Sequence, residues 1–291
     1  MSNLTKGCRM DDVNPLIIMA AGKGSRMRSG GNLPDWVLQE AASRPKAMIR
    51  LGKERKPLLG HLIEQAKAEG LRNICIVIGE SDEVTPSHFD AHPVDGITLD
   101  FVVQHIASGR SKPEGTAQAV ELALHKHPEW KGTSVTVANG DNLPPKGMFL
   151  AMQRHLCCVP AFDSAHIGLP QERVRAFAVI RGGADGTLTG IDEKPNRQTI
   201  EASRWKDGTV RVSMNYFRMP YSDLLEAVRE APLHPERMER ELPVAVSSWS
   251  ARQPGRIQVV PSAGAFLDLT HPEDILTVGR NLDRGGFQLL D

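Results

Sequence analysis

The sequence predicts an α/β fold built on a doubly wound, mostly parallel sheet, and three observations support this class. Short apolar runs alternate with helical patterns through the first half of the 291 residues, as strands and crossover helices of a parallel sheet do. A glycine-rich loop follows the first apolar run directly. Past about residue 160 the pattern changes to short β-rich segments separated by glycine turns, which predicts a β-rich region on the substrate side of the molecule.

The individual elements follow from apolar runs bounded by turn signals and from apolar residues at helical spacing. In the first half, strands are expected at 16–21, 73–79, 98–104 and 134–138, and helices at 57–69 and 115–127. In the second half, β-rich segments are expected at 173–181, 188–193, 209–219 and 266–268, and helices at 221–231 and 271–282. The glycine turn at 182–186 predicts a hairpin. Residues 28–43 are expected to form a long polar loop.

Charge and aromatic content exclude several classes of function. The chain carries 35 Lys and Arg against 35 Asp and Glu, so no global basic field exists to hold nucleic acid or anionic lipid. Aromatic residues make up 5% of the chain, which leaves few stacking platforms for single-stranded nucleic acid. We therefore expect any anion site to be local, and no nucleic-acid partner.

Cysteine spacing and the N-terminal segment indicate a cytoplasmic protein. The four cysteines form no C-x-x-C pair, which disfavours a zinc ribbon or a redox motif; they are Cys8, Cys75, Cys157 and Cys158. Acidic residues stand near the N-terminus where a secretory signal needs an apolar run. No stretch approaches the ~18 apolar residues of a membrane span, so no membrane partner is expected.

The strongest local motif is the loop that follows the first expected strand, Gly22-Lys23-Gly24-Ser25-Arg26. Glycines let backbone amides approach phosphate oxygens, and the two cations offset the phosphate charge. The loop is not a Walker A motif, because no Gly-Lys-Ser/Thr closes it, and Met27 stands where a dinucleotide fingerprint has its third glycine. By itself the spacing also fits an ordinary strand-to-loop turn.

A proline-lysine pair, Pro45-Lys46, lies downstream of the loop. A lysine held by proline can act as a fixed point charge on a phosphate, although most lysines are solvated at the surface. The order of strand, Gly-x-Gly-x-Arg-Met and Pro-Lys resembles the signature of the sugar-1-phosphate nucleotidyltransferases, the family that makes nucleotide sugars. Further segments similar to that family follow in its order: Gly115-Thr116-Ala117, Gly140-Asp141, Glu193-Lys194-Pro195 and 266–274 with Asp268.

The resemblance, which covers residues 16 to 283, implies a Rossmann-like nucleotidyltransferase fold in a single domain, 1–291. Residues 14–160 would form its nucleotide-binding half and 161–291 its sugar-binding half. The resemblance also implies roles for individual residues. The catalytic residues would be Arg26, Lys46 and Lys194. The nucleotide-binding residues would be Ala20, Ala21, Gly22, Gly24, Gln104, Gly115 and Thr116. The sugar-binding residues would be Asn139, Glu193, Lys194 and Asn215, and the ligands of a Mg²⁺ cofactor would be Asp141 and Asp268.

The reaction implied by this resemblance joins two phosphorylated substrates. A sugar 1-phosphate oxygen attacks the α-phosphorus of a nucleoside triphosphate in line, and pyrophosphate leaves. Arg26 and Lys46 would neutralise the triphosphate, and Lys194 would hold the sugar phosphate. Gln104 and Gly115 would contact the base. The base, the sugar and any homo-oligomeric state are left open.

The same residues also fit purely structural roles, and other classes of protein fit the same motifs. Asp141 can cap a turn, Asp268 can precede a helix, and Asn215 can lie on the polar face of a strand. A noncatalytic nucleotide-sensing relative, or a cytidylyltransferase for a non-sugar phosphate or phosphonate, would keep the same fold. A dinucleotide-binding oxidoreductase is disfavoured, because Asp35 and Glu40 are expected in the polar loop rather than at a strand end. No left-handed β-helix repeat follows, which argues against a fused acyltransferase.

Overall fold

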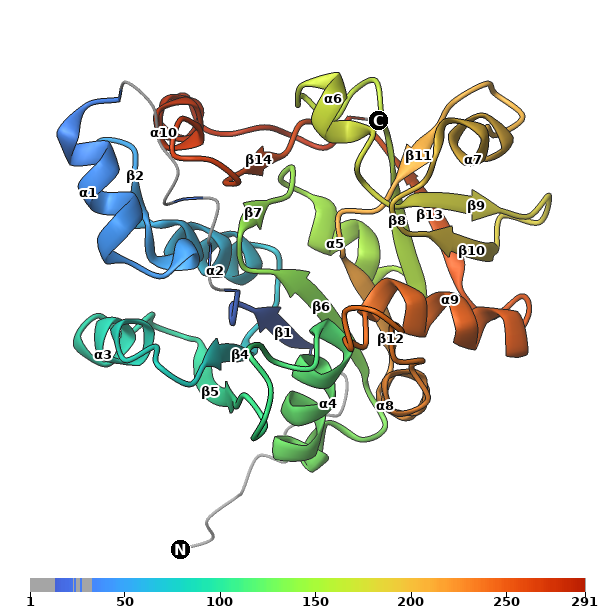
Figure 1. Cartoon of the computed structure of the whole chain (residues 1–291), viewed down its shortest axis with the longest axis horizontal. Helices are drawn as coiled ribbons and strands as arrows, with labels where there is room; N and C mark the ends of the chain where they lie inside the picture. The colour runs from blue at the N-terminus through green and yellow to red at the C-terminus, as the bar shows by residue number, and fades with distance from the viewer. Residues whose placement is uncertain (1–13, 23, 25–26, 28–32, 291) are drawn as a thin grey trace, which may run out of the picture.

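A ten-stranded sheet runs through the molecule (Figure 1). The computed structural model describes residues 14–22, 24, 27 and 33–290. The strands lie in the order β10–β9–β11–β8–β12–β6–β1–β4–β5, with β13 beside β8. Their bounds are β1 Pro15–Met19, β4 Asn73–Gly79, β5 Thr98–Gln104, β6 Ser134–Asn139, β8 Cys158–Asp163, β9 Val179–Gly182, β10 Leu188–Asp192, β11 Arg211–Val212, β12 Phe217–Pro220 and β13 Gln258–Ser262.

The first half of the chain supplies a parallel core to this sheet. Ile17 of β1 pairs with Cys75 of β4 on one side and with Val137 of β6 on the other, and β4 pairs in parallel with β5. Apolar side chains fill consecutive positions of β1 and β4, as expected for strands covered on both faces. The second half adds antiparallel strands: β12 pairs with β6, and β9 forms the expected hairpin with β10.

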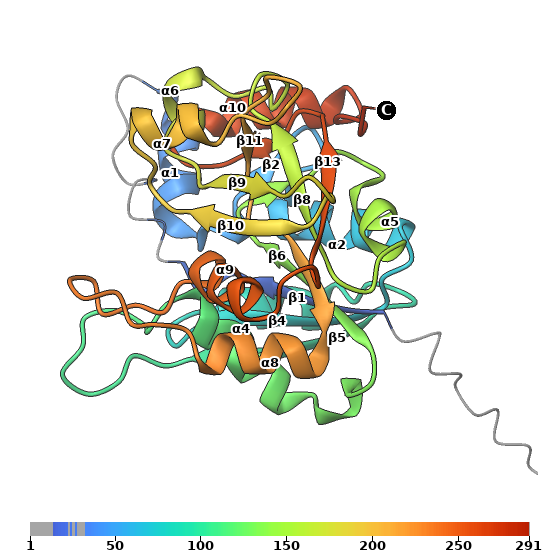
Figure 2. The ribbon, with the colours of Figure 1, turned by 90° about the vertical axis from the view of Figure 1, so that its right-hand side faces the viewer.

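Two apolar cores cover the two faces of the sheet. Because side chains alternate along a strand, Leu16 and Ile18 belong to one core and Ile17 belongs to the other. Helix α2 packs in the first core, and α4, α8 and α9 pack in the second; Figure 2 shows α2 above β1 and α8 below it. The doubly wound α/β class is therefore confirmed.

Helices and two short ladders complete the chain. The α-helices are α1 Asp35–Ser43, α2 Leu58–Ala68, α3 Val84–Ala91, α4 Thr116–Lys126, α5 Met148–Gln153, α6 Gln171–Val174, α7 Arg197–Ala202, α8 Tyr221–Arg229, α9 Leu242–Arg252 and α10 Asp274–Asp283. The short 3-10 helices are η3 Lys46–Met48 and η4 Pro128–Trp130. The ladders pair β2 Arg50–Leu51 with β3 Lys56–Pro57, and β7 Asn142–Leu143 with β14 Leu267–Asp268.

The structure corrects two expectations. The segment 28–43 is not a loop throughout, because α1 occupies Asp35–Ser43 and places both Asp35 and Glu40 on a helix. Glu40 is buried there, and its carboxylate accepts hydrogen bonds from Arg50 at 2.8 Å and Arg55 at 2.9 Å. The segment 173–181 is β-structure only at its end, because α6 includes Arg173 and β9 begins at Val179.

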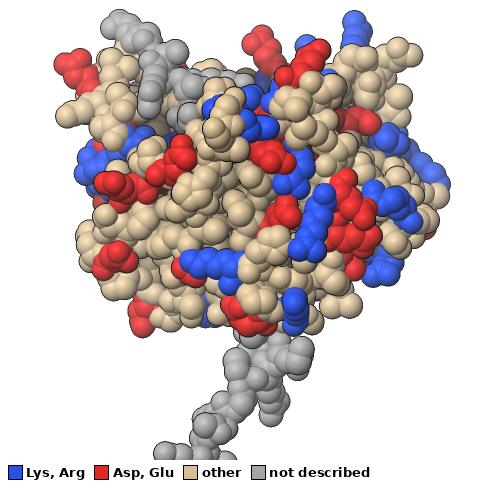
Figure 3. All heavy atoms as spheres, turned by 60° about the horizontal axis from the view of Figure 1, so that its bottom comes forward, with Lys and Arg blue, Asp and Glu red and all other residues tan. Residues whose placement is uncertain are grey.

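Charged side chains of both signs are interspersed over the face shown in Figure 3. This mixture agrees with the equal numbers of basic and acidic residues in the sequence.

Candidate active site

The loops that leave β1 and β6 lie against each other at the carboxyl edge of the parallel core. The Gly140 amide donates to the Met19 carbonyl at 2.9 Å, and the Ala20 amide donates to the Val77 carbonyl at 2.8 Å. A Cβ at Gly140 would lie 3.1 Å from both the Ala20 Cβ and the Met19 carbonyl oxygen. The glycine before Asp141 therefore allows the two loops to pack closely.

A cavity of about 540 Å³ opens above these loops, and we call it the front cavity. It brings together segments that are far apart in the sequence, and ten of the predicted site residues line it: Ala20, Ala21, Gly22, Lys46, Gln104, Gly115, Thr116, Asn139, Asp141 and Asn215. A second hollow of about 560 Å³ shares the loop from Ala20 to Gly22 with it and extends to Arg44 and Ser81. Both volumes fall in the range of small-molecule sites.

Lys46 and Asp141 meet in the front cavity. Pro45 precedes η3, the short helix that begins at Lys46. The Lys46 Nζ donates to the Asp141 Oδ2 at 2.8 Å, while the Asp141 side chain keeps 38% of its surface exposed. Gly24 packs on the stem of this lysine, because a Cβ at Gly24 would lie 3.1 Å from the Lys46 Cβ. The glycine loop, the lysine and the aspartate thus form one polar unit.

The short ladder between β7 and β14 brings Asp268 next to this unit. Asp268 pairs with Asn142, and the Leu269 amide donates to the Asp141 carbonyl at 3.1 Å. The Asp268 carboxylate is buried, and it accepts hydrogen bonds from the Thr270 hydroxyl at 2.7 Å and from the Arg173 guanidinium. Burial raises the pKa of Asp268, and the negative charge of Asp141 raises it further.

Tyr216 holds Asn142, which follows Asp141 in the chain and pairs with Asp268 in the ladder. Its hydroxyl donates to the Asn142 Oδ1 at 2.9 Å. Complete burial raises the pKa of Tyr216 well above its ordinary value, and the charges of Asp141 and Asp268 add to this effect. The tyrosine therefore remains a neutral donor and holds Asn142 in the ladder.

Gln104 and Gly115 line the opposite wall of the front cavity. The Gln104 amide nitrogen donates to the Gly115 carbonyl at 2.8 Å and to the Gln118 Oε1 at 2.9 Å. Gly115 has a φ of 105°, and a Cβ there would lie 2.4 Å from the Arg240 carbonyl oxygen. A packing contact thus requires this glycine, and contact of its backbone with a base stays a prediction.

Asn215 lies in a bend between β11 and β12, with a φ of 60°. Its amide donates to the Ser213 hydroxyl at 3.2 Å. The residue is therefore not on a strand face, and the structure removes that alternative. Its place in the wall of the front cavity keeps the sugar contact as a prediction.

Glu193 and Lys194 do not line the front cavity. Lys194 is exposed, has a φ of 47°, and makes no hydrogen bond or ion pair with a described residue. Burial raises the pKa of Glu193 to about 7, and the charge of Glu241 adds to this effect. The roles of Glu193 and Lys194 toward a sugar phosphate stay predictions. Arg26 and Lys23 lie outside the described residues.

Sequence reasoning missed several charged residues of the site. Arg173 bridges Asp268 and Asp274, and Glu239 and Glu241 line the front cavity from the segment between α8 and α9. This segment docks on the start of α4, where the Arg240 amide donates to the Glu114 carbonyl at 2.6 Å. None of these residues stands in a recognisable spacing, so the sequence held no signal for them.

The carboxylates of Asp141 and Asp268 are the candidate ligands for a divalent cation. Among the described residues, no three His, Cys, Asp or Glu side chains cluster as a complete metal cage. The segments of Asp141 and Asp268 meet at the β7–β14 ladder, and burial, followed by the charge of Asp141, raises the pKa of Asp268. Mg²⁺ is commonly bound by one or two carboxylates together with substrate phosphates and water. The two aspartates therefore fit Mg²⁺.

The doubly wound sheet, with the glycine loop, Asp141 and Asp268 at the carboxyl edge of its parallel core, places the chain among the α/β proteins whose ligands bind at that edge. The family model described as "Nucleotidyl transferase" matches residues 16–221. The chain belongs to this nucleotidyltransferase family, as the sequence motifs predicted.

The chain is also similar to part of several curated proteins. The chain is 37% identical over 192 residues to the bifunctional protein GlmU of Paracidovorax citrulli, and the match covers 65% of this chain and 34% of that protein. It is 25% identical over 210 residues to the glucose-1-phosphate adenylyltransferase of Nitrosospira multiformis, and the match covers 69% of this chain and 45% of that protein. The matched part is thus less than half of either relative.

Within the part of the chain that the structure describes, no helix combines the length and the apolar character that a membrane span needs.

Proposed function

We propose that this protein transfers a nucleotidyl group from a nucleoside triphosphate to a sugar 1-phosphate, with release of pyrophosphate. The observation that carries the proposal is the front cavity, where the glycine loop, Lys46 and Asp141 lie together with Gln104 and Gly115. Relatives named as GlmU and glucose-1-phosphate adenylyltransferase support a sugar phosphate as the acceptor.

Each part of the site has a task in this reaction. The backbone around Gly22 is exposed beside the cavity and can place amides on phosphate oxygens. Lys46 supplies a positive charge near the triphosphate, and its ion pair with Asp141 fixes the position of that charge. Such preorganised charges stabilise the charge that develops on bridging and leaving oxygens. No covalent intermediate on the protein is required.

We further propose that Asp141 and Asp268 hold Mg²⁺. When bound, the ion would offset negative charge on the phosphates. Arg173 keeps Asp268 in place through its hydrogen bond, and Arg173 itself is fixed by Asp274 at 2.8 Å. Lys194 would act on the sugar phosphate, and Glu193 on a sugar hydroxyl.

We also propose a cytoplasmic location for the protein.

Pyrophosphate release from the purified protein tests this function. The protein is incubated with Mg²⁺, each of the five common nucleoside triphosphates and a panel of sugar 1-phosphates. We expect release only when both substrates are present. Pyrophosphate release with a non-sugar phosphate or phosphonate as acceptor, but with no sugar 1-phosphate, would favour the cytidylyltransferase alternative. Triphosphate binding without pyrophosphate release from any mixture would favour a noncatalytic nucleotide sensor.

A further inference from the structure

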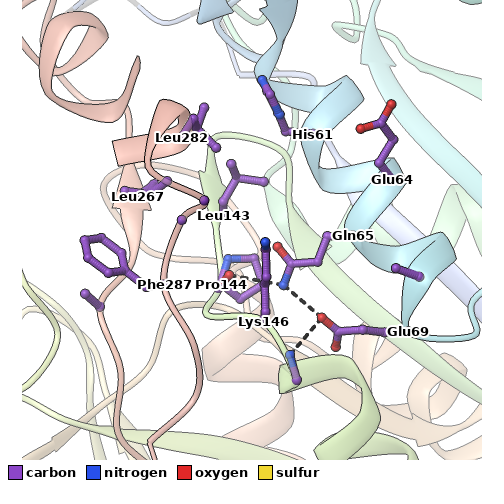
Figure 4. A pocket seen from close by; sticks show the side chains of 15 residues that line it. His61, Glu64, Gln65, Glu69, Leu143, Pro144, Lys146, Leu267, Leu282 and Phe287 are labelled. Carbon is purple, nitrogen blue, oxygen red and sulfur yellow. Dashed lines mark hydrogen bonds between the residues drawn. The ribbon is translucent and has the colours of Figure 1, made fainter. Parts of the chain in front are cut away.

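A third cavity, of about 420 Å³, is lined in part by Leu143 and Leu267 of the β7–β14 ladder, and we call it the rear cavity. Figure 4 shows its residues. It shares no lining residue with the front cavity. Its walls come from α2, from the segment after β7 and from the chain after α10. The C-terminal segment closes it, because the Lys146 amide donates to the Phe287 carbonyl at 2.8 Å and the Leu289 amide donates to the Lys146 carbonyl at 2.9 Å.

Lys146 is an exposed lysine of this cavity, which the carboxylates of Glu64 and Glu69 also line. Its ammonium group makes no hydrogen bond or ion pair with a described residue. The nearby carboxylates are already engaged: Glu64 pairs with Lys56 at 2.8 Å, and Glu69 accepts the amides of Gly147 at 2.9 Å and Phe149 at 2.7 Å. Among the described lining residues, Lys146 therefore keeps a positive charge that no described side chain pairs with.

The wall opposite α2 is apolar. Figure 4 shows Leu267, Leu282 and Phe287 on one side, the polar side chains of α2 on the other, and Lys146 between them. The cavity is also preformed, because the Gln65 amide nitrogen donates to the Pro144 carbonyl at 3.2 Å and ties α2 to the segment after β7. A concave apolar wall with one convergent charge is the common form of a small-molecule site.

His61 belongs to the α2 wall of the rear cavity. Its Nε2 is buried from solvent and has no hydrogen-bond partner among the described residues, so it is not counted as a ligand contact. Burial lowers the pKa of His61, and the charge of Lys56 lowers it further, so the imidazole is neutral near pH 7.

We propose that the rear cavity binds a small amphipathic anion, with its anionic group at Lys146 and its apolar body against Leu143, Leu267 and Phe287. Two of its lining residues are next in the chain to residues of the candidate metal site. Leu143 and Leu267 pair in the ladder, and the next pair along it is Asn142 with Asp268.

Methyl NMR on leucine-labelled protein tests the site without using turnover, so failure of this proposal is distinct from failure of the proposed nucleotidyl transfer. Phenyl phosphate is the probe, and inorganic phosphate and phenol each carry one half of its chemistry. We expect saturable shifts of the Leu143, Leu267 or Leu282 methyl signals with phenyl phosphate, assigned with Leu267→Met and Leu282→Met. We expect binding about tenfold weaker or more for either half alone.

A matched pair of variants decides whether Lys146 carries the anion. Lys146→Gln should weaken phenyl phosphate binding by about tenfold or more. Lys131→Gln makes the same charge change at another exposed lysine, one that does not line the cavity, and should leave the affinity unchanged. The proposal is overturned if no leucine of the rear cavity shifts, if phenol binds as well as phenyl phosphate, or if the two variants weaken binding equally.

Discussion

Replacing Asp141 with asparagine separates catalysis from stability. The Asp141 side chain is 38% exposed, and its ion pair to Lys46 is at the wall of an open cavity. Partly exposed ion pairs contribute about 1 kcal/mol or less to the free energy of unfolding. For a chain of this size that loss lowers Tm by less than about 4 °C. Asparagine keeps the volume and an acceptor oxygen, so the fold should remain intact.

The catalytic effect of Asp141→Asn should be much larger. The variant removes one of the two carboxylates that fit Mg²⁺ and one charge that fixes Lys46. Misplacing these charges should cost about 3 kcal/mol of transition-state stabilisation, which is roughly a hundredfold in turnover. Pyrophosphate release at saturating substrates measures this loss, and urea unfolding measures stability. We also expect the Mg²⁺ concentration for half-maximal rate to rise.

Asp90→Asn is the matched control, because Asp90 is exposed on α3 and lines neither the front cavity nor the rear cavity. It should change neither turnover nor Tm. Undiminished turnover by Asp141→Asn, or by the unaltered protein in excess chelator, would refute the metal role of this aspartate.

Three further predictions concern the phosphates and pH. Gly22→Val should weaken triphosphate binding by about tenfold or more in calorimetry, since the side chain blocks amides from phosphate oxygens; Tm should stay unchanged, because no atom lies within 4 Å of the added Cβ. Lys46→Ala should weaken triphosphate binding measured without sugar, whereas Lys194→Ala should mainly raise the KM for the sugar 1-phosphate and lower turnover. Burial, followed by the charge of Glu241, raises the pKa of Glu193 to about 7. The folded protein therefore binds the proton of this carboxyl more tightly than the unfolded chain does. The free energy of unfolding consequently falls as pH rises from about 4.5 through 7. Glu193→Gln should remove this loss and be more stable than the unaltered protein by about 3 kcal/mol above pH 8, with no difference near pH 4.

Each of these predictions has an outcome that contradicts it. Unchanged triphosphate affinity in Gly22→Val would reassign the loop as a structural turn. Equal weakening of triphosphate binding by the two lysine variants, with unaltered sugar-phosphate kinetics, would remove Lys194 from the sugar side. Parallel stability curves for Glu193→Gln and the unaltered protein between pH 4 and 8 would show that Glu193 titrates normally.

The fold was predictable where local pattern and tertiary burial agree. Strands β4 and β5 occupy the predicted residues, because their apolar runs are bounded by turn signals. Strand β8 was missed, because Pro160 within a run argues against a central strand. Helix α9 was missed because a proline argues against a helix interior. Pro243 lies in the first turn of α9, where proline is tolerated.

The site was predictable only where motifs are contiguous in the sequence. The residues around Gly22, Lys46 and Asp141 lie together as their motifs indicated. Asp268 was reached by resemblance alone, and no spacing led to Arg173 or Glu241, because their positions depend on how distant segments dock.

The β7–β14 ladder also bears on the order of folding. The segment with Asp141 belongs to the parallel core, whereas Asp268 arrives from the last tenth of the chain and is attached through two residue pairs. Contacts between such distant segments close large loops and carry a high entropic cost. We therefore expect the sheet and its phosphate loop to form before the second carboxylate docks. Hydrogen exchange at the Leu269 amide, which donates to the Asp141 carbonyl at 3.1 Å, should then be faster than exchange in β1, because the ladder opens without unfolding the sheet.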